Sequence, residues 1–143
     1  MKDYDNAERY FAAAYSLAAQ DRSFNTFQLD NAHASFLLDR SLNLSSAEAI
    51  SDFFKAHSNV EKELQSHESR YMYYPYRTAR RYLSFYNKHY RHLIPEHQNQ
   101  FVACCRYVLD HVERIPVDVI RSNKDLLTCK KNLREIIHRT CYR

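Results

Sequence analysis

Arginine and tyrosine side chains alternate along residues 70–91, in the segment RYMYYPYRTARRYLSFYNKHYR. This segment holds seven of the twelve tyrosines and six lysine or arginine residues. Arginine can bind phosphate groups, and tyrosine rings can stack on unpaired bases, as in proteins that bind single-stranded nucleic acid. The candidate phosphate-binding residues are Arg77, Arg80, Arg81 and Arg91. The candidate stacking residues are Tyr71, Tyr73, Tyr74 and Tyr76.

The same segment also fits a packed helix. Tyr82, Tyr86 and Tyr90 are four residues apart, which places them on one face of a helix, where they can enter a core or a helix interface. In that case Arg80 and Arg81 only form a solvated face. Both interpretations remain open from the sequence.

Two arginine-histidine pairs form a second candidate site. Arg106 precedes His111 with four residues between them, and Arg91 precedes His97 with five. This spacing resembles the motif of the HEPN ribonucleases, which are helical and of similar length. The resemblance implies that Arg106 would stabilise phosphate charge and His111 would serve as acid or base on a ribose hydroxyl. Because a chain with eight histidines and many arginines contains such pairs by chance, the primary prediction is that the protein is not an enzyme.

The remaining cysteines and histidines predict no metal and no cofactor. The four cysteines form no Cys-x2-Cys pair, so neither a zinc site nor a disulfide framework is expected. His89 and His92 could begin a metal site, but they lack a carboxylate or cysteine partner at suitable spacing. A charged surface helix is the expected location for both histidines.

The chain of 143 residues contains no glycine. Glycine-rich phosphate loops, the Rossmann fingerprint and the nucleophile elbow all need glycine, so these sites are excluded. Most β-hairpin turns also use glycine, and only three prolines are present. The composition therefore predicts an all-α protein, with residues 1–143 as a single domain.

Charge divides this domain into two halves. Residues 1–66 hold ten acidic and six basic side chains, a net charge of −4, whereas residues 67–143 hold fifteen basic and seven acidic ones, a net charge of +8. No apolar run is long enough for a membrane span, and the first twenty residues lack the pattern of a signal peptide. We expect a cytoplasmic protein with no membrane partner.

Hydrophobic spacing predicts about six helices, packed as antiparallel hairpins. Ser45 or Ser46 should cap the third helix, with Glu48 placed for a capping box, and Pro75 and Pro95 should begin the fourth and fifth. Residues 116–124 fit either a short helix or a turn. The predicted ranges are 5–19, 30–42, 45–64, 75–92, 95–115 and a last helix from 118 or 122 to about 137.

One short pattern occurs twice, 42 residues apart. Ala7, Phe11 and Ala14 read A-x3-F-x2-A, and so do Ala49, Phe53 and Ala56. The pattern resembles the second helix of a tetratricopeptide repeat, where small residues let paired helices approach and the aromatic ring fills the gap. The spacing exceeds the usual 34 residues, so a fragment of a similar α-solenoid is expected, not a consensus array. The first helix would then lack its hairpin partner.

Two segments resemble a family of larger proteins. They are SFNTFQLDNAHASFLLDRSL (23–42) and YYPYRTARRYLSFYNKHY (73–90). Both resemble the helical C-terminal region of bacterial antiviral proteins that carry a sirtuin-like or P-loop effector domain. The resemblance implies a sensing or assembly module, and the effector chemistry would reside in domains outside this chain.

We therefore expect a non-enzymatic helical module that binds a protein or peptide, such as an upstream effector domain, in a groove lined by the basic, tyrosine-rich fourth helix. The alternative is an RNA-binding or nucleic-acid-binding domain, or a HEPN-like ribonuclease, that uses the basic half.

Overall fold

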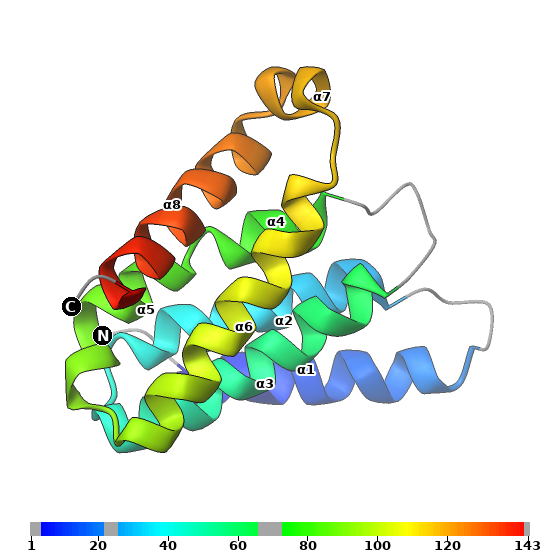
Figure 1. The fold of residues 1–143 in the computed structure, drawn as a ribbon. Helices are drawn as coiled ribbons and strands as arrows, with labels where there is room; N and C mark the ends of the chain where they lie inside the picture. Colours follow the sequence, from blue (N-terminus) through cyan, green and yellow to red (C-terminus); the bar gives the residue numbers. More distant parts are fainter. Residues whose placement is uncertain (1–3, 22–25, 66–72, 142–143) are drawn as a thin grey trace.

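The computed structural model describes residues 4–21, 26–65 and 73–141, and within them the protein is all-α. Figure 1 shows the helices as one packed assembly. The helices are α1 (Tyr4–Ala19), α2 (Phe27–Ser41), α3 (Ser46–Leu64), α4 (Tyr74–Ala79), α5 (Tyr82–His89), the 3-10 helix η2 (Tyr90–His92), α6 (Pro95–Glu113), α7 (Val117–Ser122) and α8 (Lys124–Cys141).

Helices α2 and α3 form the most extensive pair, an antiparallel hairpin as predicted. Ser45 caps α3: its Oγ accepts from the amide of Glu48 at 3.4 Å and donates to that glutamate's Oε1 at 3.2 Å. The cap satisfies an amide that the first turn would otherwise leave unpaired. Helices α4 and α6 pack on this hairpin, and α8 packs on α4, α5 and α6.

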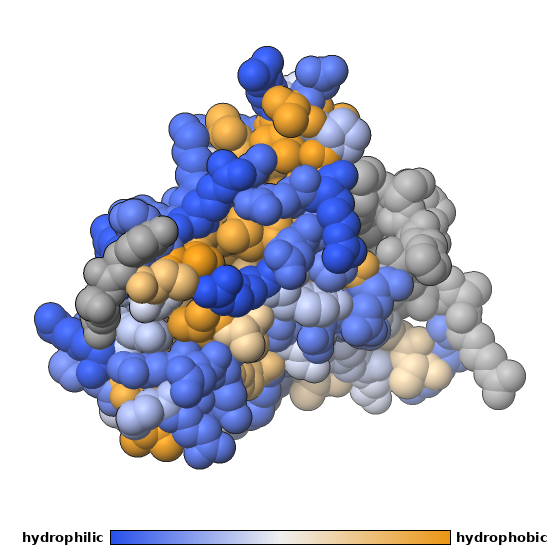
Figure 2. Space-filling model, in the orientation of Figure 1, coloured by the Kyte–Doolittle hydropathy of each residue, from blue (hydrophilic) through white to orange (hydrophobic). Residues whose placement is uncertain are grey.

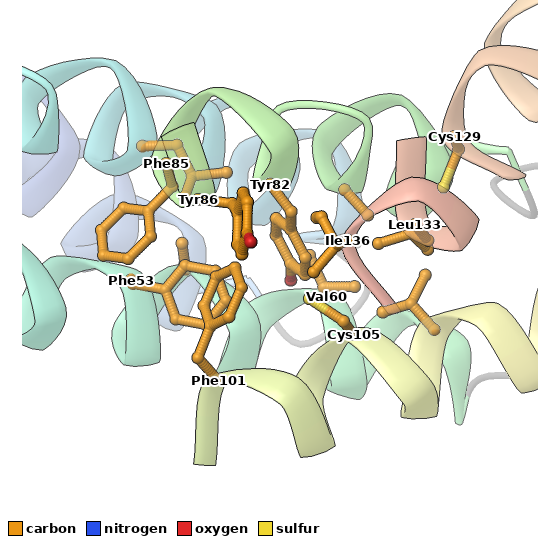
Figure 3. Packing of buried hydrophobic residues seen from close by; sticks show 14 of the residues in the cluster. Phe53, Val60, Tyr82, Phe85, Tyr86, Phe101, Cys105, Cys129, Leu133 and Ile136 are labelled. Carbon is orange, nitrogen blue, oxygen red and sulfur yellow. The ribbon is translucent and has the colours of Figure 1, made fainter. Parts of the chain in front are cut away.

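The core is aromatic where α3, α5 and α6 meet (Figure 3). The ring of Phe53 lies 4.8 Å, centroid to centroid, from each of the rings of Tyr82, Phe85 and Phe101. His57 stacks on Phe53 and shares a 2.8 Å hydrogen bond with the Tyr82 hydroxyl. Burial lowers the pKa of His57 to about 4, so this imidazole is neutral at pH 7.

The predicted fourth helix is divided between α4 and α5 at Arg80 and Arg81. The carbonyl of Arg80 accepts a 2.9 Å hydrogen bond from Asn132 of α8. This tertiary contact takes the place of a hydrogen bond within the helix and accounts for the break. The periodicity of the segment could not show it, so the sequence predicted one continuous helix.

Of the two predicted alternatives for residues 116–124, the structure has the short helix. Residues 117–122 form the short helix α7, and α8 begins after Asn123. The Oδ1 atom of Asn123 accepts from the amides of Asp125 and Leu126 at 3.0 and 3.2 Å, so Asn123 caps this helix, close to the later of the two predicted starts.

Helix α1 lies at the edge of the fold and packs mainly on α2. Phe11 is its one buried residue, and it contacts the rings of His33 and Phe36. Tyr10 and Leu17 are 68% and 67% exposed. Among the described residues, no helix is both long and apolar enough to cross a membrane.

Candidate functional site

The predicted phosphate-binding arginines of α4 and its junction with α5 already have carboxylate partners. Asp125, in the first turn of α8, accepts from Arg77 Nε at 3.1 Å and from Arg80 Nη1 at 2.6 Å. Arg81 Nε lies 3.8 Å from a carboxylate oxygen of Asp39 and donates through Nη1 to the carbonyl of Arg77. These ion pairs reduce the positive charge that a phosphate backbone would meet.

The predicted stacking tyrosines are mostly part of the packing. Tyr76 is only 5% exposed, and burial raises its pKa to about 12. Its ring has no free face for a base, which corrects the stacking prediction. Tyr73 packs against the core, and the Tyr74 hydroxyl accepts a hydrogen bond from Gln28 at 3.2 Å. Tyr71 lies outside the described residues.

Tyr82, Tyr86 and Tyr90 are buried, so the packed-helix interpretation of their four-residue spacing is confirmed. The exposed Arg91 lies apart from α4, on η2, where its Nε donates to His92 Nε2 at 3.2 Å. The structure therefore does not unite the predicted binding residues in one open site.

The residues of the ribonuclease alternative face different neighbours. Arg106 donates to Cys141 of α8 at 3.1 Å, while Nδ1 of His111 donates to the carbonyl of Tyr107 at 2.8 Å. The ring of Tyr107 in turn contacts His57 of α3. Five residues along a helix correspond to a rotation of about 140°, which accounts for the separation of the two side chains.

His89 does not lie on a surface helix, contrary to expectation. It is 1% exposed, its Nε2 donates to the carbonyl of Ser41 at 2.7 Å, and its Nδ1 accepts from the Ser46 hydroxyl at 2.8 Å. Burial lowers its pKa. This histidine joins α5 to both ends of the loop between α2 and α3, so both of its nitrogen atoms are engaged in structure.

The described cysteines are all free, and the described residues contain no cluster of three or more metal-ligating side chains. Cys105 is buried and Cys104 is half-buried. Burial raises the pKa of Cys104 to about 12, so its thiol is protonated at pH 7 and is a poor nucleophile.

A groove that the sequence did not predict runs along the outer side of α3. Three hollows adjoin on this side of the helix and share residues: two of them flank its first half, and the third lies beside its second half. A hollow of about 520 Å³ lies between α3 and the start of α6, and one of about 450 Å³ lies between α1, α2 and α3. Both are lined by Lys55 and Ser58. A third, also of about 520 Å³, lies near the starts of α1 and α3 and shares Ser51 with the first.

The floor of the α3 groove is made of small side chains and its wall is apolar. Ala47, Ser51 and Ser58 are exposed along the groove. Phe54 is half-buried and contacts the edge of His97 at a centroid distance of 5.9 Å. Small residues on a helix allow another helix to approach closely, and the aromatic wall offers apolar contact to it.

Polar residues close the α1 side of the groove. Asp30 is 2% exposed and accepts hydrogen bonds from Tyr15 at 2.7 Å, Thr26 at 3.0 Å and Lys62 at 2.9 Å. This carboxylate joins α1, α2 and α3 at one point. Lys55 forms no ion pair with any described residue and extends into the groove's lining.

The face of the molecule around α6, α7 and α8 carries a different surface. Figure 2 shows hydrophobic residues between the polar ridges of α8 and α6 and around α7. Partly buried side chains that pack on the core from these helices include Val102, Leu109, Val119, Leu127 and Ile137. Their burial against the core accounts for this strip, whereas the α3 groove is hollow.

The sequence contained one usable signal for this groove. Ala47, Ser51 and Ser58 fall on the side of the third predicted helix that faces away from its apolar stripe, at spacings of four and seven residues. Only the positions of α1 and α6 turn that side of the helix into a groove.

Comparisons with protein-family models, curated proteins and solved structures found no match for this chain.

Proposed function

We propose that this protein is a helical protein-interaction module that binds a partner protein in the α3 groove. The observation that carries the proposal is that three hollows share residues on the outer side of α3, with small residues on the floor and Phe54 on the wall. Apolar clefts with a few polar groups at the rim are typical binding surfaces.

The binding surface in this proposal differs from the one expected at first. The groove is lined by α1, α2, α3 and α6, not by the basic fourth helix. The arginines of α4 are paired with Asp125, so the alternative of nucleic-acid binding through them has less support. The role as a sensing or assembly module in bacterial antiviral defence rests on the resemblance of residues 23–42 and 73–90.

Site-specific photocrosslinking tests the proposal. A photoreactive phenylalanine analogue at Ser58 should crosslink a discrete partner in host cells, while the same analogue at exposed Asp110 of α6 should not. The captured partner is then purified and titrated against the protein. We expect Ser51→Arg, which fills the floor without removing any core contact, to weaken binding more than tenfold.

Two results would overturn this function. One is an identical set of crosslinked proteins from Ser58 and Asp110. The other is a purified partner whose affinity is unchanged by Ser51→Arg and by Phe54→Ala, with folding of both variants verified by circular dichroism.

A further inference from the structure

A smaller hollow lies between α5, η2 and the last turn of α8, apart from the α3 groove. Figure 1 shows the end of α8 beside α5. The volume of the hollow is about 230 Å³, and its lining residues are Tyr86, Asn87, Tyr90, Arg91 and Arg139. None of these residues lines the α3 groove, so the two surfaces are separate.

Two guanidinium groups from separate elements line this hollow. The first belongs to Arg91 of η2, which donates through Nε to His92 at 3.2 Å. Arg91 forms no ion pair with any described carboxylate, and its two Nη groups have no partner among the described residues. This arginine is therefore available to an incoming anion.

The second guanidinium, that of Arg139, is already held in position. Its Nη1 donates to Asn87 Oδ1 at 3.0 Å, its Nη2 donates to Glu135, and its central carbon lies 5.9 Å from the centroid of the Tyr86 ring. These bonds use two of the five N–H groups of the guanidinium. The Asn87 amide accepts with its oxygen and keeps its Nδ2 as a donor without a described partner. Because the group is ordered before an anion arrives, binding costs little further side-chain entropy.

Little negative charge surrounds the hollow. Residues 69–95, which include all of α5 and η2, contain no aspartate and no glutamate. The carboxylate paired with Arg139 is that of Glu135, whose side chain is 43% exposed, and exposed ion pairs of this kind are weak. Basic residues near the C-terminal end of a helix interact favourably with the helix dipole. The dipole explains their presence at these ends, but it does not require two of them to line one hollow.

The charge and the size of the hollow indicate the class of ligand. Arginine binds phosphate oxygens through paired hydrogen bonds. A phosphate monoester carries close to two negative charges at pH 7, because its second pKa is about 6, whereas a carboxylate or a phosphate diester carries one. Two guanidinium groups match the dianion. The volume corresponds to about seven water molecules at about 30 Å³ each, which is room for a phosphate group and the first carbon atoms attached to it.

We propose that the hollow between α5, η2 and α8 binds a phosphate monoester, with Arg91 and Arg139 on the phosphate oxygens and Asn87 donating beside them. This site goes beyond the proposed function and does not depend on the α3 groove.

A titration followed by nuclear magnetic resonance tests the site. The ¹⁵N-labelled protein, in phosphate-free buffer at pH 8, is titrated with methyl phosphate, a dianion, and with dimethyl phosphate, a monoanion. Methyl phosphate should shift the amide signals of Asn87, Arg91 and Arg139, and it should bind at least about threefold more tightly than dimethyl phosphate. Equal affinities would overturn the inference, since a diester such as a nucleic-acid backbone would then bind as well.

Substitutions assign this binding to the hollow. Arg91→Gln and Arg139→Gln should each weaken the binding of methyl phosphate at least about fivefold, with folding verified by circular dichroism. Arg134→Gln is the matched control, because Arg134 pairs with Glu113 on the exposed surface as Arg139 pairs with Glu135, but lies outside the hollow. Its affinity should change less than about twofold. Unchanged affinity in both of the first two variants, or an equal loss in Arg134→Gln, would overturn the inference.

Two larger monoesters identify the source of the phosphate group. Stronger binding of ribose 5-phosphate assigns the site to a small phosphorylated metabolite, and stronger binding of a phosphoserine hexapeptide assigns it to a phosphorylated side chain. Both results support the inference. If neither compound shifts the amide signals at 10 mM, the inference is wrong, and crosslinking from Ser58 still tests the proposed function separately.

Discussion

Helices α1 and α3 carry the same A-x3-F-x2-A pattern in different surroundings. In α3, Ala49, Phe53 and Ala56 are fully buried, because α2 covers one flank of this helix and α4, α5 and α6 cover others. In α1, only Phe11 is buried, and the two alanines of the pattern, Ala7 and Ala14, remain half-exposed. The pattern therefore indicates a face that can be packed, and the number of neighbouring helices determines how far it is packed.

The two helices are also held in the fold in different ways. Phe53 lies among rings from three other positions in the core, whereas α1 is held by Phe11 and by polar contacts at its ends. These polar contacts include Tyr15 with Asp30, Glu8 with Arg40, and Tyr4 with Asn43. An element of this kind has a lower local stability than the core.

Truncation of the two phenylalanines should give the largest difference. We expect Phe53→Ala to lower the free energy of unfolding by about 3–5 kcal/mol, the range for a large buried ring. Phe11→Ala should cost about 1–2 kcal/mol, because α1 can shift to close the space. Urea unfolding followed by circular dichroism measures both.

Equal losses for the two variants would show that α1 is as firmly packed as α3. If Phe53→Ala does not fold, Phe53→Leu and Phe11→Leu provide the same comparison with smaller cavities.

The pH dependence of stability should differ between a buried side chain at the end of α3 and one in the middle of the same helix. The pKa of Glu63 in the folded protein, about 8, lies above its ordinary value of 4.5. The folded protein therefore holds the proton of Glu63 more tightly than the unfolded chain does. The stability that this protonated carboxyl allows is complete below pH 4.5 and is lost as the pH rises to 8. Glu63→Gln should remove this dependence and stabilise the protein at pH 8 by on the order of 3 kcal/mol relative to the wild type.

The buried His57 acts in the opposite direction, since its pKa of about 4 lies below the ordinary 6.5. Its stabilising contribution is present above pH 6.5 and is lost as the pH falls toward 4. The free energy of unfolding of Glu63→Gln minus that of the wild type, measured in urea from pH 5 to pH 9, isolates the effect of the Glu63 carboxyl group. Glu61→Gln on the same helix is the control, and a flat difference would contradict the assignment.

The smallest effect should come from the hydroxyl that ties α1 to the groove. Tyr15→Phe removes the hydrogen bond to Asp30 and should cost about 1 kcal/mol, the usual net contribution of one hydrogen bond, because the tyrosine that donates it is only half-buried. Hydrogen exchange should become faster in the amides of α1 and stay unchanged in α3. Leu17→Ser, at an exposed position on α1, should alter stability by less than about 0.5 kcal/mol. Faster exchange in both helices would show that they open together.

Much of the fold could be predicted because it follows from local patterns. The apolar stripe of α3 and the cap at Ser45 involve residues within a few positions of one another. The division between α4 and α5 could not be predicted, since it depends on a bond from Asn132, 52 residues away from Arg80.

The candidate site was less accessible to prediction for the same reason. Sequence spacing placed Arg77, Arg80 and Arg81 together, but the carboxylates that pair with them, Asp125 and Asp39, come from α8 and α2. The α3 groove consists of side chains that are individually unremarkable in sequence, and it exists because α1 and α6 stand on either side of them.

The sequence by itself determined that this protein is all-α, because the absence of glycine and the helical spacing of apolar residues act through local backbone preference and need no knowledge of distant contacts. Only the tertiary structure decided which of two identical motifs became the core, that His89 is buried, and where a groove opens. Burial, ion pairing and hollows depend on which helices meet, and that is settled by contacts between residues far apart in the chain.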